Sequence, residues 1–222
     1  MSTAKALAEL RALMQARLDP ISGWSGTAHP EYSDFDLNPG FRPAQKPKLR
    51  DSAVLIPVVA REEGFGILLT RRADTLTSHT GQIAFPGGRR DEGETPVQTA
   101  LREAHEEIGL DPAFADPVGL SDRYETITGY AVTPVVALVR PGFTLTPSPA
   151  EVAEVFEAPF AFLMDPGNHK REFFERDGHK RWFYAMPWEG KYIWGATAAM
   201  LRALWIRLYG EEATPAEAEA AG

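Results

Sequence analysis

The sequence predicts a fold of the α+β class, in which a mixed central sheet lies between helices as an α/β/α sandwich. Two observations carry this prediction. Strand-like hydrophobic segments occur in both hairpin and crossover spacing around two long helical segments. The chain has 222 residues and a 44% hydrophobic composition, enough for one sizeable core and not clearly enough for two. We therefore expect one domain, at residues 51–210, with additional segments at both ends.

The N-terminal segment, residues 1–50, is expected to hold a helix followed by irregular chain. Apolar residues recur at helical spacing near its start, which predicts an extra amphipathic helix. These residues are Leu7, Leu10, Met14 and Leu18. The chain after them is rich in proline, glycine, aspartate and asparagine, which favour turns. At the other end, the alanine- and glutamate-rich residues 211–222 predict a disordered acidic tail.

Between these ends, short runs of β-branched and leucine residues predict strands. The strands are expected at 52–61, 67–73, 83–88, 116–126, 130–142 and 151–163, with a break at Pro159 in the last. Alternating residues around Asp177 and Gly178 predict a further hairpin at 170–186, because this dipeptide favours a tight turn. A second long helix is expected at 196–210.

The composition excludes several classes of function. The chain has no cysteine, so any metal must be held by oxygen or imidazole ligands. The net charge is -8, and four of the negative charges lie in the tail, so residues 1–210 carry -4 and offer no basic surface for nucleic acid. No segment resembles a membrane span or a signal peptide. We expect a cytoplasmic protein without nucleic-acid or membrane partners, and the sequence leaves a homodimer open.

The helix predicted at 96–108 has well-marked ends. Thr95 and Gln98 fit a capping box, in which each residue bonds the backbone of the other. Pro96 takes the first helical position, where its missing N–H is not needed. Gly109 ends the helix because glycine readily adopts the left-handed conformation found there.

Three glutamates, Glu103, Glu106 and Glu107, lie near the end of this helix. They cover an arc of about 100°, away from an apolar stripe. The stripe consists of Val97, Leu101, Ala104 and Ile108. We therefore expect the stripe to face the core and the three carboxylates to converge outward. Their mutual repulsion opposes the helix dipole, and a divalent cation would relieve it. Oxygen ligands alone favour Mg²⁺ or Mn²⁺, and a solvated acidic face is the alternative.

The spacing of the residues around this helix resembles the Nudix box at every fixed position. The fixed positions are Gly88, Glu94, Arg102, Glu103, Glu106, Glu107 and Gly109, with Ala104 and Leu110 at the two apolar positions. The resemblance implies an α/β/α hydrolase that cleaves a nucleoside diphosphate linked to another group. In that family a divalent metal neutralises charge on the diphosphate and activates the water that attacks phosphorus.

The resemblance also assigns roles to individual residues. It implies that Glu103 and Glu107 are the principal metal ligands, with Glu106 as a third carboxylate that binds metal or handles the attacking water. It places Arg102 and Glu94 at structural and orienting positions of the catalytic set. It brings the Gly87 and Gly88 backbone to the same ion and to the substrate, and the Gly87 carbonyl often joins the coordination. A general base could come from Glu151 or Glu154, and either could equally be a surface residue.

Residues 68–88, LLTRRADTLTSHTGQIAFPGG, resemble the signature of the coenzyme A diphosphatase branch. Thr77 departs from it, because the signature has a second basic residue there. The resemblance implies 4'-phosphopantetheine and adenosine 3',5'-bisphosphate as products. Arg72, with Arg71 as the alternate, is the candidate that binds the 3'-phosphate. These consecutive residues face opposite sides of a strand, so at most one of them is expected to do so.

Two rival interpretations remain open from sequence. One is a Nudix hydrolase that acts on another small nucleotide, such as ADP-ribose or NADH. The other is a Nudix-like binding domain without catalysis, and the complete set of glutamates argues against it.

Overall fold

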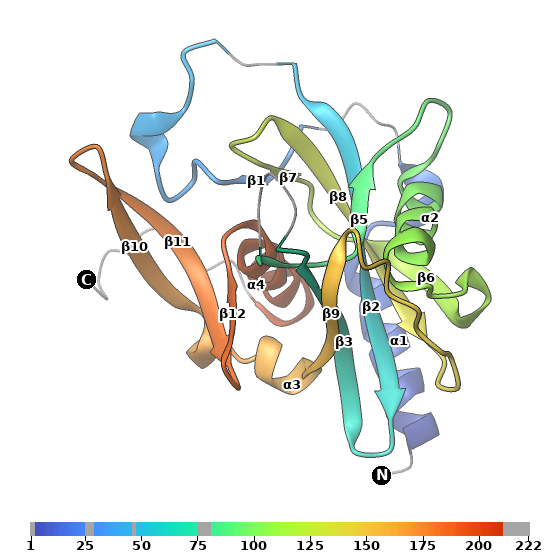
Figure 1. Cartoon of the computed structure of the whole chain (residues 1–222). Helices are drawn as coiled ribbons and strands as arrows, with labels where there is room; N and C mark the ends of the chain where they lie inside the picture. Colours follow the sequence, from blue (N-terminus) through green and yellow to red (C-terminus); the bar gives the residue numbers. More distant parts are fainter. Residues whose placement is uncertain (1–2, 25–28, 46–47, 75–80, 211–222) are drawn as a thin grey trace.

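The computed structural model describes residues 3–24, 29–45, 48–74 and 81–210 (Figure 1). Thr77 lies outside the described residues, and so does the predicted tail at 211–222. The predicted fold class is confirmed, because a mixed sheet carries helices on both faces.

The central sheet of the described residues contains nine strands in the order β1-β7-β8-β2-β3-β4, with β5 on β2, β6 on β8 and β9 on β3. The strands are β1 (Tyr32–Ser33), β2 (Arg50–Arg61), β3 (Gly64–Arg72), β4 (Ile83–Ala84), β5 (Gly87–Arg89), β6 (Ala115–Leu120), β7 (Tyr124–Glu125), β8 (Tyr130–Val139) and β9 (Val152–Pro159). The predicted hairpin is confirmed by β2 and β3, while β2 and β8 pair in parallel. The segments predicted as single strands at 83–88 and 116–126 are each split in two.

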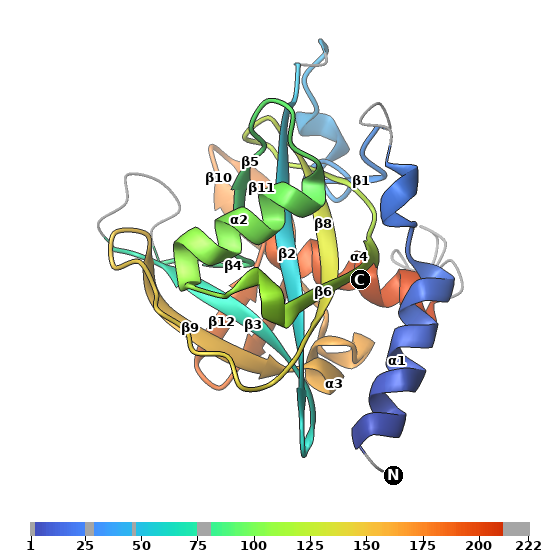
Figure 2. The same cartoon turned by 90° about the vertical axis from the view of Figure 1, so that its right-hand side faces the viewer.

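The helices are α1 (Thr3–Arg17), α2 (Pro96–Ile108), α3 (Phe160–Leu163) and α4 (Ala196–Tyr209), with 3-10 turns η1 (Ile21–Gly23), η2 (Pro39–Phe41), η3 (Pro112–Phe114) and η4 (Pro166–Asn168). Helix α2 covers one face of the sheet, and α4 lies behind the other (Figure 2). Side chains alternate between these faces along β2. Leu55 packs in the cluster that contains α2, while Ile56 packs in the cluster that contains α4. Strand β2 is therefore apolar on both faces, as expected of a covered central strand.

A second, three-stranded sheet stands beside the central one (Figure 1). It is formed by β10 (Lys170–Arg176), β11 (His179–Trp188) and β12 (Lys191–Trp194). The predicted hairpin is confirmed, because Arg176 pairs with His179 and both turn residues, Asp177 and Gly178, have positive φ. The sequence predicts no strand at β12, the element that completes this sheet.

Helix α1 is integrated into the same core as the sheet. Leu10, Met14 and Leu18 are buried in the cluster that also holds α4 residues. The irregular segment that follows adds strand β1, which pairs in parallel with β7. None of the described helices is long and apolar enough to cross a membrane.

Candidate functional site

Helix α2 begins and ends where the sequence predicts. The Thr95 side chain accepts a hydrogen bond from the Gln98 N–H at 3.3 Å, and the Thr95 N–H donates to Gln98 Oε1 at 2.8 Å. Gly109 ends the helix in the left-handed conformation, with φ of 69°. The capping box and the terminating glycine are thus confirmed, and they fix the position of α2 beside β5.

The expected orientation of the three glutamates is wrong. Glu107 is buried with 6% of its surface exposed, and the Glu103 side chain is 17% exposed. Only Glu106, at 56%, faces solvent. Ala104 and Ile108 of the expected stripe are buried, but Val97 and Leu101 are only partly buried. The buried face is therefore rotated toward Thr99, Ala100 and Glu107. Two carboxylates therefore face the protein, and the third points away.

Glu107 lies against the backbone of the glycine turn, residues 86–88, where the chain passes from β4 into β5. The Gly87 N–H donates to Glu107 Oε2 at 3.2 Å. Burial raises the pKa of Glu107 to about 7, and the nearby carboxylates of Glu103 and Glu151 act in the same direction. The hydrogen bond from Gly87 and the charge of Arg72 only partly offset this effect.

Gly88 provides the space for the Glu103 carboxyl. A Cβ atom on Gly88 would lie 2.5 Å from the Glu103 carboxyl carbon. Gly87 is equally close to backbone, because a Cβ there would lie 2.5 Å from the Ala53 carbonyl oxygen. Burial also raises the pKa of Glu103, although hydrogen bonding to Arg102 opposes it. Glycine at both positions lets α2 and its carboxylates approach the β5 backbone.

Arg102 connects the acidic residues of the box. Its Nη1 donates to Glu103 Oε1 at 2.8 Å and to Glu106 Oε2 at 3.0 Å. Its Nε and Nη2 bond both carboxylate oxygens of Glu94, at 2.8 and 3.1 Å. One guanidinium therefore sets the direction of three carboxylates, a geometry that suits the planar fork of arginine.

Glu94 accepts further hydrogen bonds that keep it ionised. The Thr99 hydroxyl donates to Oε2 at 2.7 Å, and the Asp91 N–H donates to the same oxygen at 3.1 Å. Hydrogen bonding to Arg102 is the largest influence, and it lowers the pKa of Glu94 to about 2. Glu94 holds Arg102 in place rather than facing the glycine turn itself.

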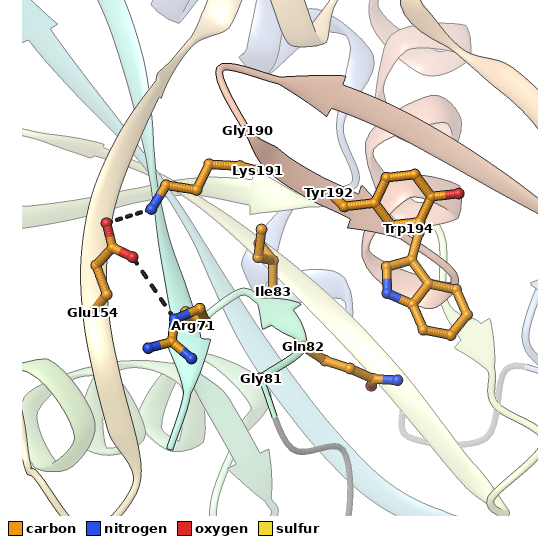
Figure 3. A pocket seen from close by; sticks show the side chains of 9 residues that line it. All are labelled: Arg71, Gly81, Gln82, Ile83, Glu154, Gly190, Lys191, Tyr192 and Trp194. Atoms are coloured by element: carbon orange, nitrogen blue, oxygen red, sulfur yellow. Dashed lines mark hydrogen bonds and ion pairs between the residues drawn. The ribbon is translucent and has the colours of Figure 1, made fainter. Parts of the chain in front are cut away.

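The two consecutive arginines of β3 face different surroundings, as strand alternation requires. Arg72 is close enough to Glu107 to lower the pKa of that carboxyl. Arg71 instead bonds Asp74 Oδ1 at 2.9 Å and lies 3.8 Å from Glu154 Oε2. Figure 3 shows Arg71 in a pocket with Glu154 and Lys191. Of the two, Arg72 therefore belongs with the α2 carboxylates.

The two candidate general bases, Glu151 and Glu154, also lie in different surroundings. Glu151 precedes β9 and is exposed, and its charge raises the pKa values of both Glu103 and Glu107. Glu154 lies on β9 itself and forms ion pairs with Lys191 and Arg71. Glu151 is thus the candidate near the α2 carboxylates, while Glu154 belongs to the pocket.

The donor set around Glu103 and Glu107 fits a hard divalent cation. Both carboxylates are partly desolvated, and positive charge near them would favour their ionised forms. All the side-chain donors are oxygens, which Mg²⁺ and Mn²⁺ prefer. Among the described residues, no three His, Cys, Asp or Glu side chains are placed to hold a metal ion as they stand. Glu106 is turned toward Arg102, so a third carboxylate would have to rotate inward.

Sequence reasoning does not single out Lys191 for this region. No motif surrounds it, and only the long-range approach of β12 to β4 and β9 brings it to Glu154. The alternation of Tyr192 and Trp194 along β12 is the signal that could have found the other residues of this pocket. Both aromatic residues line the pocket that also contains Arg71.

An α/β/α sandwich in which a glycine turn leads into an acidic helix defines the class of this protein. A model of the Nudix domain matches residues 49–183. The uncharacterized Nudix hydrolase NudL of Escherichia coli O7:K1 is 40% identical over 163 residues, which cover 72% of this chain and 83% of that protein. NudL of Cronobacter sakazakii is 41% identical over 162 residues, with the same coverage. The chain belongs to the Nudix family, and it is a hydrolase of a diphosphate bond in a nucleoside diphosphate derivative.

Solved structures with a similar fold include an Ap4A hydrolase of C. elegans in a binary complex. It is 18% identical, and the match covers 50% of this chain and 80% of that chain with a TM-score of 0.44. The Nudix hydrolase RenU of M. smegmatis is 26% identical, with 50% and 71% covered and a TM-score of 0.44.

Proposed function

We propose that this protein hydrolyses the diphosphate linkage of coenzyme A or its derivatives with the help of Mg²⁺ or Mn²⁺. The observation that carries the proposal is the pair of partly buried carboxylates, Glu103 and Glu107, packed against the turn at Gly87 and Gly88. The substrate assignment rests on residues 68–88, which resemble the coenzyme A diphosphatase signature and supply this turn. Arg72, beside Glu107, adds a cation for an anionic substrate.

In the proposed site, Glu103 and Glu107 would hold the cation, and Glu106 would add a third carboxylate after rotating away from Arg102. Arg102 fixes the carboxylates, and Glu94 fixes Arg102. A bound divalent cation supplies positive charge for the diphosphate oxygens and makes the attacking water more acidic. The Gly87 and Gly88 backbone allows the diphosphate to approach closely, and Arg72 balances its negative charge.

We assign the general base to Glu151, because it is exposed and near enough to Glu103 and Glu107 to influence their pKa values, whereas Glu154 is paired with Lys191 and Arg71. The Glu151 carboxylate takes a proton from water as the water oxygen attacks one phosphorus. The bond between that phosphorus and the bridging oxygen breaks, and the second phosphate leaves with the electron pair. With coenzyme A, the products are 4'-phosphopantetheine, in acylated form for an acyl derivative, and adenosine 3',5'-bisphosphate.

A substrate panel with products identified by mass spectrometry tests this proposal. The panel contains coenzyme A, acyl-coenzyme A, dephospho-coenzyme A, ADP-ribose and NADH, each with Mg²⁺ or Mn²⁺ and with chelator. We expect cleavage of coenzyme A or an acyl form with the highest kcat/KM, and none with chelator. A higher kcat/KM for ADP-ribose or NADH would overturn the substrate assignment. If the protein binds the metal but cleaves no diphosphate in the panel, the proposed hydrolysis is itself overturned.

Substitutions of the carboxylates test their roles separately. Glu103→Gln and Glu107→Gln should each lower kcat at least about 100-fold and weaken Mn²⁺ binding, because each removes a charged ligand. Glu151→Gln should lower kcat about 100-fold and leave Mn²⁺ binding unchanged, as expected of a base. Glu157→Gln is the matched control, because Glu157 lies on β9 and pairs with Arg61. Wild-type kcat in Glu151→Gln would refute its assignment.

A further inference from the structure

A pocket of about 430 Å³ lies beside β3, between β4, β9 and the strand β12 (Figure 3). The proposed catalytic carboxylates do not line it. Arg71 points into this pocket, whereas the next residue, Arg72, is coupled to Glu107. Arg71 and Arg72 are consecutive residues of β3, with Cα atoms about 3.8 Å apart, and strand alternation directs one toward the pocket and the other toward the carboxylate site. A substrate held at both places would pass the end of β3.

One side of the pocket carries alternating charges. The Glu154 carboxylate forms ion pairs with Lys191 and with Arg71, and Figure 3 shows both cationic side chains directed at it. Arg71 also bonds Asp74, whose side chain is 70% exposed and can be displaced at little cost. With Asp74 displaced, Arg71 and Lys191 outnumber Glu154, and the resulting net positive charge suits a phosphate group, which arginine binds through two parallel hydrogen bonds.

The other side of the pocket is aromatic. Tyr192 and Trp194 project from the same face of β12, with ring centroids 6.4 Å apart and planes inclined by 37°. Tyr192 is 41% exposed, yet its hydroxyl is held by Glu172 at 2.5 Å. A large ring that is both exposed and fixed in position offers a face on which a nucleobase can stack.

We propose that this pocket binds the nucleoside end of the substrate. The base stacks on Tyr192 and Trp194, and the phosphate on the ribose 3' position pairs with Arg71 and Lys191. This inference rests on the proposed function and deepens it, because it names the residues that distinguish a 3'-phosphorylated nucleoside from an unphosphorylated one. It favours Arg71 over Arg72 for the 3'-phosphate and leaves Arg72 to the diphosphate.

Steady-state kinetics with coenzyme A and dephospho-coenzyme A test the cationic side. In Arg71→Gln and Lys191→Met, KM for coenzyme A should rise about tenfold, the loss of roughly one charge-assisted bond. The kcat and the KM for dephospho-coenzyme A should stay within about twofold, because that substrate lacks the contacted group. Lys191→Arg, which keeps the positive charge, should keep the wild-type preference for coenzyme A over dephospho-coenzyme A. Equal losses for both substrates would overturn the phosphate assignment.

The aromatic side predicts a different pattern. Tyr192→Leu should raise KM about tenfold for both substrates, since both carry the base, and Tyr192→Phe, which keeps the ring but loses the bond to Glu172, should raise KM by less. The matched controls are Phe174→Ala and Lys180→Met, which lie on β10 and β11 outside the pocket. Melting temperatures near that of the wild type show that each variant is folded. Wild-type KM in Tyr192→Leu would overturn the stacking assignment.

A binding measurement separates failure of this inference from failure of the proposed function. Titration calorimetry compares adenosine 3',5'-bisphosphate with adenosine 5'-phosphate, and it requires no turnover. The wild type should bind the bisphosphate about 100-fold more tightly, and Lys191→Met, which keeps Arg71, should bind it about tenfold more tightly. Equal binding by the wild type would overturn the pocket assignment even if coenzyme A is hydrolysed. If the wild type discriminates and no diphosphate is cleaved, the proposed catalysis fails and the pocket stands.

Discussion

Arg102 and Glu94 show how one pair of residues orients an acidic site. Arg102 bonds Glu103 and Glu106 on its own helix and both oxygens of Glu94 before the helix. Without Glu94, the Arg102 guanidinium could shift toward Glu103 or toward Glu106. The pair therefore limits where the Glu103 carboxylate can point, which preserves the site against the repulsion of its own charges.

This pair predicts a pH dependence of stability. The pKa of folded Glu94 is lowered to about 2, so its contribution is fully present above the ordinary pKa and is lost as pH falls through about 4.5 toward 2. Glu94→Gln should destabilise the protein by about 2 kcal/mol at pH 7, and the difference should shrink below pH 4. Urea denaturation with chelator measures both values. A difference that is constant with pH would contradict the ion-pair account.

The sequence selects candidate site residues better than it predicts their directions. The resemblance to the Nudix box selects Glu94, Arg102 and the three glutamates, because the motif is local. It does not show that Glu107 is buried. The burial depends on Gly87, which lies in β5, and on the small residues that bring α2 close to the sheet. Strand alternation separates Arg71 from Arg72, but only the packing of β12 shows which one enters the pocket.

At the scale of elements, the start of β5 combines two glycines with different surroundings. Beside Gly88, the neighbouring atoms are the end of the flexible Glu103 side chain. Beside Gly87, they are the backbone of β2. The first glycine therefore makes room for a functional group, and the second allows two strands to pair.

These surroundings predict opposite effects of the same substitution. Gly88→Ala should displace the Glu103 carboxylate, lowering kcat at least about tenfold while stability changes by less than about 1 kcal/mol. Gly87→Ala should instead destabilise the fold by about 3 kcal/mol, because backbone atoms of Ala53 and Val54 cannot move aside. Kinetics together with urea denaturation of both variants measure these effects. Similar losses of stability in the two variants would contradict the distinction.

The ends of α2 and the hairpin of β10 and β11 were predictable because caps and turns act within a few residues. Thr95, Gln98 and Gly109 mark the helix, and Asp177 and Gly178 mark the turn. Strand β12 was not predictable in this way. It depends on pairing with β11 and on contact with β4, which lies more than 100 residues earlier in the sequence.

At the scale of the whole molecule, helix α1 belongs to the core rather than to a separate appendage. Met14 is fully buried among residues of α4 and the central sheet. Arg207 of α4 additionally bonds the Arg17 carbonyl at the end of α1 and pairs with Asp19. The predicted boundary at residue 51 therefore follows a change in sequence composition, but the hydrophobic core extends across it.

This packing predicts that α1 unfolds together with the Nudix domain. Met14→Ala should lower the free energy of unfolding by about 3 kcal/mol, the usual loss for a buried methionine. Unfolding should remain a single transition by both circular dichroism and tryptophan fluorescence. Leu13→Ala, on the same helix at a partly buried position, should cost less. Two separate transitions would show that α1 folds independently.

The parallel pairing of β2 with β8 has a consequence for how the protein reaches its native state. Arg50 pairs with Tyr130 and Val59 with Val139, so each contact closes a loop of about 80 residues. That loop contains β3, the glycine turn and all of α2. Contacts so distant in sequence slow folding, since chain entropy must be lost before they form. Helix α2 can become ordered early, but its carboxylates gain their final surroundings only when the chain has been synthesised past β8.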